Sequence, residues 1–250
     1  MTALSINLNK ISLLRNSREG NYPSVLKHAQ LCIDNGADGI TVHPRPDQRH
    51  IRPSDVRELS ELVKPLADIE FNVEGNPFAS AIADYPGFIS LVEQTQPDQC
   101  TLVPDSDSQL TSDHGFDLNH SGEALEPIIT RLKDQGMRVS LFMDPNLEQI
   151  ELAAEIGADR IELYTGPYAE AWGSESAELM FQQHKKAAEL ATSLGMGVNA
   201  GHDLNLHNLA KFATIPGLLE VSIGHAFIVD SLMMGMASTV QAYKKLLNQH

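Results

Sequence analysis

Short apolar runs alternate with amphipathic stretches along the chain. At four places an amphipathic stretch ends in glycine and an apolar run follows at once: DNGADGITV (34–42), KDQGMRVSL (133–141), EIGADRIEL (155–163) and TSLGMGVNA (192–200). Glycine directly after a helix accepts the left-handed backbone conformation that closes the last turn. An apolar run in this position is typical of a buried parallel strand. The pattern therefore predicts a repeated helix–strand unit.

Extended over the chain, the pattern predicts eight strands. They lie near residues 3–9, 39–43, 68–73, 99–104, 138–143, 160–165, 197–201 and 219–224. Helical patterns fill the intervening segments, which predicts a parallel sheet covered by helices. Eight such units in 250 residues favour a single (β/α)₈ TIM-barrel domain over residues 1–250. An open doubly wound sheet is the alternative, but no GxGxxG or P-loop motif supports it.

Polar residues occur in these strands where a buried parallel strand is normally apolar. They are Asn7, Asn9, Glu70 and Glu162, and, at strand ends, His43, Arg45, Asn199, Gly201, His202, Gly224 and His225. The carboxyl ends of barrel strands carry the active site, so these side chains are expected to meet there. A carboxylate inside a barrel is costly unless it is paired, which marks Glu70 and Glu162 as candidate catalytic groups. For Asp105 and Asp144, capping of the next helix is the alternative to a functional role, and it is favoured for Asp144, which precedes Pro145.

The balance of charge bears on the ligand. The formal net charge is −15 and the isoelectric point is near 5.0, which argues against a nucleic-acid partner. Basic residues nevertheless cluster in segments 10–20 and 43–52, where they would attract an anionic ligand; Arg15 and Arg52 are expected to be solvated. The glycines that end strands 7 and 8 are typical of a phosphate site. The long polar segment 104–122 is expected to form a lid, with Thr111 contacting the ligand.

Composition also bears on location. Cys32 and Cys100 have no metal-like or redox-like spacing and are expected to be buried thiols. The first ten residues lack the apolar region of a signal peptide, and no apolar run is long enough to cross a membrane. We therefore expect a cytoplasmic protein without a membrane partner.

Six segments together resemble the pyridoxine 5′-phosphate synthase family: TVHPRPDQRHI (41–51), TLVPD (101–105), VSLFMD (139–144), ELYTGPYA (162–169), VNAGHDLN (198–205) and IGHA (223–226). They occur in order and span essentially the whole chain. The resemblance implies a (β/α)₈ barrel that condenses 3-amino-2-oxopropyl phosphate with 1-deoxy-D-xylulose 5-phosphate. The products would be pyridoxine 5′-phosphate, inorganic phosphate and water. It further implies a homo-octamer that uses no metal and no organic cofactor.

The resemblance also implies roles for individual residues. His43 and Glu70 would accept protons, His202 would donate one, and Glu162 would stabilise a charged intermediate. The aminooxopropyl phosphate would be bound by Asn7, Arg18, Gly224 and His225, and the deoxyxylulose phosphate by Arg45, His50 and Thr111. The chain departs from the family pattern at Asn9, Lys10 and Asp203, which we expect to alter substrate contacts while leaving the activity intact. Each step of such a condensation moves a proton, which suits histidines and partly buried glutamates.

Two other functions stay open. A metal-dependent barrel hydrolase or isomerase could use His43, Glu162, His202 and His225 as ligands, although strand 1 lacks the His-x-His pair common in such hydrolases. A catalytically silent barrel could bind a phosphorylated ligand as a sensor. Metal analysis of the purified protein tests the first alternative, and a turnover assay tests the second.

Overall fold

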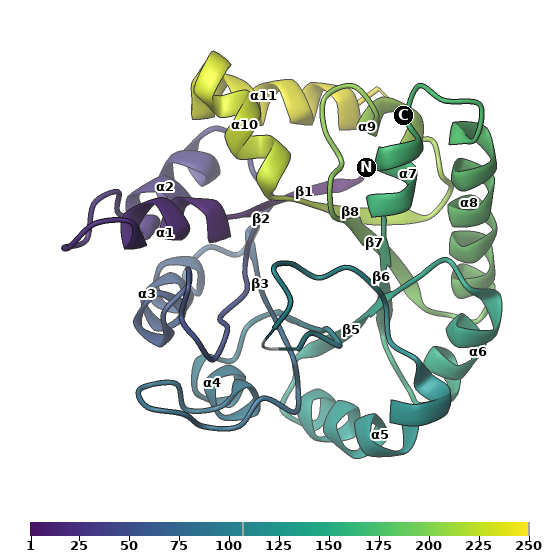
Figure 1. Ribbon diagram of the computed structural model, residues 1–250, viewed down its shortest axis with the longest axis horizontal. Coiled ribbons are helices and arrows are strands. Elements are labelled where there is room, and N and C mark those ends of the chain that lie inside the picture. Colours follow the sequence, from purple (N-terminus) through teal and green to yellow (C-terminus); the bar gives the residue numbers. More distant parts are fainter. Residues whose placement is uncertain (107, 250) are drawn as a thin grey trace.

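A closed barrel of eight parallel strands, ringed by helices, forms the centre of the molecule (Figure 1). This is seen in a computed structural model that describes residues 1–106 and 108–249. Neighbouring strands pair in chain order, and β8 pairs with β1 to close the barrel. The predicted TIM-barrel fold is confirmed, and the open sheet is excluded.

The strands are β1 (Ala3–Asn7), β2 (Gly39–Val42), β3 (Glu70–Gly75), β4 (Gln99–Leu102), β5 (Arg138–Met143), β6 (Arg160–Tyr164), β7 (Gly197–Gly201) and β8 (Leu218–Ile223). The helices are α1 (Asn9–Asn16), α2 (Val25–Asp34), α3 (Pro53–Val63), α4 (Phe88–Thr95), α5 (Leu118–Asp134), α6 (Leu147–Glu155), α7 (Gly166–Ala171), α8 (Ala177–Ser193), α9 (Leu209–Phe212), α10 (His225–Met234) and α11 (Met236–Leu247). All eight strands lie close to their predicted positions.

The barrel interior is polar, while the layer between strands and helices is apolar. Successive side chains of a strand point to opposite faces, and one face of each strand supplies fully buried residues such as Ile6 and Ile40 to the hydrophobic core. The other face points inward, where the hydroxyls of Ser5 and Thr41 hydrogen-bond at 2.7 Å and Thr101 donates to the Asn72 oxygen at 3.1 Å. This division explains why the strands read as broken apolar runs.

The inner layer near the amino ends of the strands is a charged network. Glu220 accepts hydrogen bonds from Asn199 at 3.3 Å and from Arg160 at 3.4 Å. Gln99 connects this group to Arg138, whose Nε donates to the Gln99 oxygen at 2.9 Å. Polar groups removed from water are stable only when they are paired, and this network satisfies them by cross-strand contacts.

The segment between β4 and α5 lies across the barrel in the view of Figure 1. It is shorter than the predicted loop because α5 begins at Leu118, where the Asp117 side chain accepts from the Asn119 N–H at 3.2 Å. Its Thr111 hydroxyl lies 3.0 Å from Nε2 of His202, which follows β7 on the far side of the barrel. The segment therefore covers the carboxyl ends of the strands, as a lid would.

Individual contacts also decide the expectations for Asp144, Arg15 and the two cysteines. Asp144 does not cap a helix: it accepts from the Gly115 N–H at 3.1 Å, and Asn146 caps α6 instead. Arg15 is not solvated, because it is fully buried against the Asp55 carboxylate. Both cysteines are buried free thiols, as predicted.

Candidate active site

A pocket of about 340 Å³ opens at the carboxyl ends of the strands. Most of the predicted site residues line it: Asn7, Asn9, Lys10, His43, Arg45, His50, Thr111, Glu162, His202, Asp203, Gly224 and His225. They come from β1 and β6 and from the segments that follow β1, β2, β4, β7 and β8, so residues more than 200 positions apart share one cavity. Strand-end position in a closed barrel is therefore a sound guide to this site.

Glu70 does not belong to this pocket, and the prediction of its location is wrong. It is the first residue of β3, at the amino end of the barrel, where its side chain is 48% exposed and ion-paired with Arg138. It lines a separate pocket of about 230 Å³ at that end, beside Asp38 and Glu220. Alternation along the strand correctly gave the face of Glu70, but the face alone does not give the depth within the barrel.

Glu74 occupies the position that was assigned to Glu70. It lies on the same face of β3 four residues later, which moves it about 13 Å toward the carboxyl end at 3.3 Å per residue. Its carboxylate lies 3.9 Å from Nδ1 of His43 and accepts from the Asn7 amide at 3.4 Å. Burial, followed by the nearby Glu162, raises its pKa well above the ordinary value. The sequence signal was present, because the predicted strand stopped one residue before Glu74.

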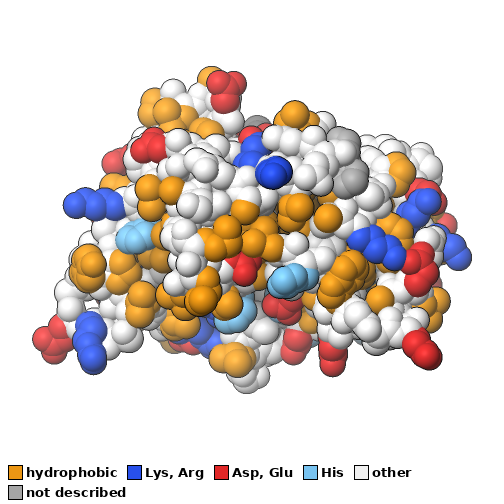
Figure 2. All heavy atoms as spheres, turned by 90° about the horizontal axis from the view of Figure 1, so that it is seen from above, with side chains coloured by type: hydrophobic (Ala, Val, Ile, Leu, Met, Phe, Trp, Pro, Cys, Tyr) orange, Lys and Arg blue, Asp and Glu red, His pale blue; other side chains and the backbone are white. Residues whose placement is uncertain are grey.

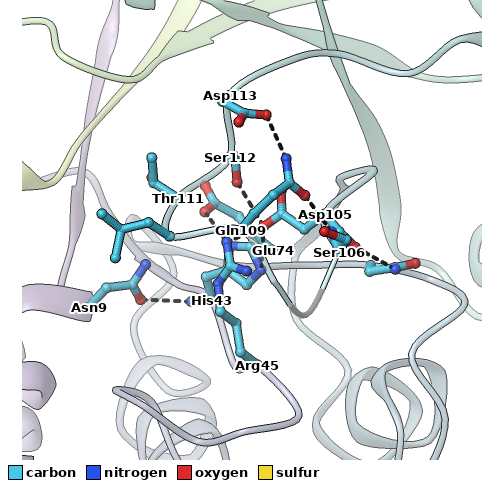
Figure 3. A network of polar contacts seen from close by, with 12 residues as sticks. Asn9, His43, Arg45, Glu74, Asp105, Ser106, Gln109, Thr111, Ser112 and Asp113 are labelled. Atoms are coloured by element: carbon cyan, nitrogen blue, oxygen red, sulfur yellow. Dashed lines mark hydrogen bonds and ion pairs between the residues drawn. The ribbon is translucent and has the colours of Figure 1, made fainter.

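Asp105, on the loop after β4, joins His43 and Arg45 (Figure 3). Its Oδ2 atom forms an ion pair with Arg45, lies 3.5 Å from Nε2 of His43 and accepts from the Ser112 hydroxyl at 2.9 Å. The carboxylate is buried and caps no helix, so the capping alternative that the sequence left open does not apply to Asp105. Burial lowers the pKa of His43 well below its usual value, and the Arg45 charge adds to the effect. His43 is therefore neutral at physiological pH and able to accept a proton.

His43, directly after β2, is held in place by Asn9, which follows β1. The Asn9 amide oxygen accepts from the His43 N–H at 2.9 Å, and the Asn9 N–H donates to the Asn7 side chain at 3.0 Å. The Asn9 oxygen is thus engaged with the backbone of His43. The departure from the family pattern at Asn9 is compatible with an ordered site.

His202 lies across the pocket from His43 in a strained backbone conformation. Its φ angle is 84°, and that of Asp203 is 61°; residues other than glycine seldom adopt such angles, and those that do are common at functional sites. Nδ1 of His202 lies 2.9 Å from the Asp203 carboxylate, so its other ring nitrogen faces Thr111 and the pocket. The hydrogen bond from His202 also lowers the pKa of Asp203. An ionised Asp203 favours a proton on Nδ1 of His202.

Glu162 lies deeper in the lumen, below the two histidines. Burial raises its pKa to about 8, with Glu220 adding to the effect and a hydrogen bond from Thr101 opposing it. A carboxyl group of this kind can exchange a proton near neutral pH. The neighbouring strand β7 has no room for a side chain at position 201, because a Cβ added to Gly201 would lie 2.3 Å from the Glu162 carboxylate. Gly201 was noted only as a strand-end residue, and this close approach is its structural reason.

Donors for anionic groups lie at opposite sides of the pocket. On one side, burial and Arg45 lower the pKa of His50 to about 3, and its Nδ1 accepts from the Ile51 N–H at 2.9 Å. The neutral His50 ring therefore carries its proton on Nε2. On the other side, Gly224 precedes the ten-residue helix α10, whose N-terminal N–H groups suit a phosphate.

Arg18 is not brought to the pocket within the chain. Its side chain is exposed, just after the end of α1, and it is not among the residues that line the cavity. Lys10 and Arg49 supply positive charge there in addition to Arg45. Arg49 was noted in the sequence only as one of a basic cluster.

Over residues 1–106 and 108–249, no group of three or more His, Cys, Asp or Glu side chains has the arrangement of a metal site. None of the helices in these same ranges combines the length and apolar character needed to cross a membrane.

A closed parallel barrel with histidines and buried carboxylates at the carboxyl ends of its strands defines a barrel enzyme of the acid–base class. The chain belongs to the family described as pyridoxal phosphate biosynthesis protein PdxJ, whose family model matches residues 4–249. The resemblance seen in the sequence is therefore confirmed.

Relatives agree with this assignment, and solved structures share the fold. The pyridoxine 5′-phosphate synthase of Xanthomonas axonopodis pv. citri is 54% identical over 247 residues, which cover 98% of this chain and 96% of the relative. That of Xylella fastidiosa is 51% identical over 99% of this chain and 95% of the relative. Among solved structures, the tryptophan synthase alpha chain of Legionella pneumophila is similar with a TM-score of 0.66 and 12% identity, covering 99% of this chain and 92% of that one. At this identity the likeness concerns the fold alone.

Proposed function

We propose that this chain is a pyridoxine 5′-phosphate synthase, a transferase of vitamin B6 biosynthesis. It condenses 3-amino-2-oxopropyl phosphate with 1-deoxy-D-xylulose 5-phosphate and releases phosphate and water. The observation that carries the proposal is the meeting of two buried carboxyl groups and two histidines in one pocket with anion-binding groups at its sides. The names of the full-length relatives give the product, and the family resemblance implies the two substrates.

Proton transfer accounts for every step of this reaction. An amine adds to a ketone, water leaves, an enamine forms, phosphate is expelled and an aldol closure completes the ring. His43 is suited to accept protons because it is neutral and buried, and Glu74 takes the second base role in place of Glu70. His202 is the proton donor when both of its ring nitrogens carry protons, because Nδ1 is held by Asp203 and Nε2 faces the pocket beside Thr111. Glu162, deeper in the lumen, stabilises positive charge on an intermediate when it is ionised.

The two phosphate groups bind at opposite ends of the pocket. The deoxyxylulose phosphate binds at Arg45, His50 and Thr111, where a guanidinium and a neutral imidazole both donate. The aminooxopropyl phosphate binds at the N-terminus of α10, with Gly224, His225 and Asn7 around it. A Cβ on Gly224 would meet the Asn7 side chain at 3.2 Å, so glycine supports close approach here. Lys10 and Asp203 border the pocket and complete the substrate contacts.

The test is the two-substrate condensation assay, read by formation of the pyridoxine ring in ultraviolet absorbance and by mass spectrometry. Product should appear only when both phosphorylated substrates are present, and one inorganic phosphate should be released per ring formed. Binding of either substrate without turnover, under conditions in which a related synthase is active, would favour the sensor alternative and refute the proposal.

We also infer that the protein is a cytoplasmic homo-oligomer, with an octamer expected from the family resemblance. Support for self-association comes from α10, whose Leu232 and Met233 are 79% and 87% exposed. Hydrophobic side chains gather across the face of the molecule that carries α10 and α11 (Figure 2), and such patches favour association. Light scattering after gel filtration should give a mass well above the 27.4 kDa of one chain. The free thiols support a reducing compartment, which cell fractionation would test.

A further inference from the structure

Asp105 lies at a junction of four segments of the site. Its carboxylate contacts His43 and Arg45, from the end of β2 and the loop after it, and Ser112, from the covering loop. Its backbone carbonyl accepts from the Asn76 amide, just after β3, at 2.7 Å. The side chain is only 4% exposed. A buried carboxylate with this many contacts cannot be a solvated loop residue.

The partners of Asp105 suit its ionised form. Burial raises the pKa of Asp105, whereas Arg45 and the Ser112 hydroxyl, which both donate to Oδ2, oppose this effect and favour the ionised form. Only Nη2 of Arg45 has a hydrogen-bond partner among the described residues. The Nη1 and Nε atoms of the guanidinium thus stay available for a ligand, while Asp105 sets the plane in which they point.

The same carboxylate oxygen decides which nitrogen of His43 carries the proton. Nε2 of His43 lies 3.5 Å from Oδ2 of Asp105, and Nδ1 lies 3.9 Å from Glu74. The lone pair of an imidazole nitrogen is repelled by a neighbouring anionic oxygen, whereas an N–H is attracted to it. The contact is longer than an ideal hydrogen bond, as is common for catalytic pairs before substrate binds. The neutral ring therefore carries its proton on Nε2.

We propose that Asp105 is a positioning residue that fixes the Nε2–H tautomer of His43, so that Nδ1 is the proton acceptor, and holds Arg45 in a phosphate-binding orientation. The inference rests on the proposed function for the base role of His43, but the tautomer itself does not depend on any substrate. Asp105 touches neither substrate in this scheme and acts through the two residues that do.

The first experiment measures the tautomer directly. The protein is labelled with ¹⁵N-histidine, and the His43 resonances are identified by their loss in His43→Gln. In the wild-type protein at neutral pH, the ¹⁵N shifts should show a protonated Nε2 and an unprotonated Nδ1. Asp105→Asn should shift His43 toward the other tautomer or a mixture of the two. A wild-type protein with the proton on Nδ1 of His43 would overturn the proposal, whatever the variants do.

The second experiment measures kinetics in the condensation assay. Asp105→Asn should lower kcat about 10²-fold, in the range for a misdirected general base, and raise KM for deoxyxylulose phosphate through Arg45. The acid limb of the kcat/KM profile should move to lower pH, because loss of a nearby anion makes His43 harder to protonate. Asp105→Glu, which keeps the carboxylate, should recover a substantial part of kcat. A purely structural role would leave the pH profile in place.

Controls separate position from charge and from folding. Asp113→Asn makes the same change of charge on an exposed residue of the same loop and should leave kcat, KM and the pH profile unchanged. Circular dichroism and melting temperature identify an unfolded variant. If Asp105→Asn does not fold, the kcat of Asp105→Glu and the His43 tautomer of the wild-type protein still test the positioning role of Asp105. Normal kcat and an unmoved pH profile in folded Asp105→Asn would refute the proposal; inactivity of all variants and of the wild-type protein would instead refute the proposed function.

Discussion

Replacing Glu74 and Glu70 by glutamine, one at a time, gives a matched test of the site. The two residues lie on the same face of β3, four positions apart. Glutamine keeps the size of either side chain and cannot accept the proton. The difference between the variants therefore reports only which end of the barrel carries the chemistry.

The structure gives the expected magnitudes. Glu74→Gln removes a buried group beside His43, and loss of a positioned general base costs on the order of 10²–10⁴-fold in kcat. Its free energy of unfolding should equal or exceed that of the wild-type protein, because a buried carboxylate is lost. Glu70→Gln breaks an ion pair with Arg138 in which Glu70 is about half exposed, worth about 0–1 kcal/mol in stability. Its kcat should stay within about twofold of wild type.

Steady-state condensation kinetics and urea unfolding, run in parallel on both variants, make the measurement. Glu70→Gln serves as the control for Glu74→Gln, since both replace one carboxyl group of the same strand by an amide. A folded Glu70→Gln with a kcat reduced more than about tenfold, beside a nearly normal Glu74→Gln, would refute the assignment of the active end. Loss of activity in both, with both folded, would show that the amino-end network controls the site.

Three further outcomes are expected. The pKa of Glu162 is raised to about 8 from 4.5, so the folded state holds a proton that the unfolded state has lost. The stability that the wild-type protein gains from this group is greatest below about pH 4.5 and declines as pH rises toward 8, by up to about 1.4 kcal/mol per pH unit. The melting temperature of Glu162→Gln relative to wild type should therefore rise over that range, and a pH-independent difference would contradict this. Arg45→Ala should raise KM for deoxyxylulose phosphate about ten- to hundredfold, and an unchanged KM would remove Arg45 from the phosphate site. The same variant should lose about 3–5 kcal/mol of stability, measured by calorimetry at neutral pH, because Asp105 is left buried without its cation. Activity should survive EDTA, since the steps need only proton transfer; a loss that zinc or manganese reverses would favour the metal-dependent alternative.

Most of the site could be predicted because a closed parallel barrel brings all strand ends together. Once the apolar periodicity locates a strand, any polar residue at its carboxyl end is a candidate, and this reasoning found His43, Glu162 and His202. It failed at Glu70 because a two-residue period gives a side chain's face and not its depth. A strand boundary one residue too short was enough to hide Glu74.

Residues held by long-range pairs could not be predicted from local pattern. Asp105 resembles a helix cap in sequence, and its burial depends on Arg45, 60 positions earlier. Arg15 resembles a surface residue, and only the approach of Asp55 from α3 explains its burial. In both cases the deciding contact is made by tertiary packing, which no short window of sequence contains.

The left-handed backbone at His202 and Asp203 has a consequence for attempts to improve the protein. Positive φ costs a residue with a Cβ on the order of 1 kcal/mol or more, and glycine adopts it freely. Selection of variants for heat resistance alone would therefore favour glycine or asparagine at these two positions. Such variants would gain a more relaxed turn after β7 while losing the imidazole that faces the pocket. Libraries for thermostability should hold this pair constant and seek their gains on the helices of the outer ring.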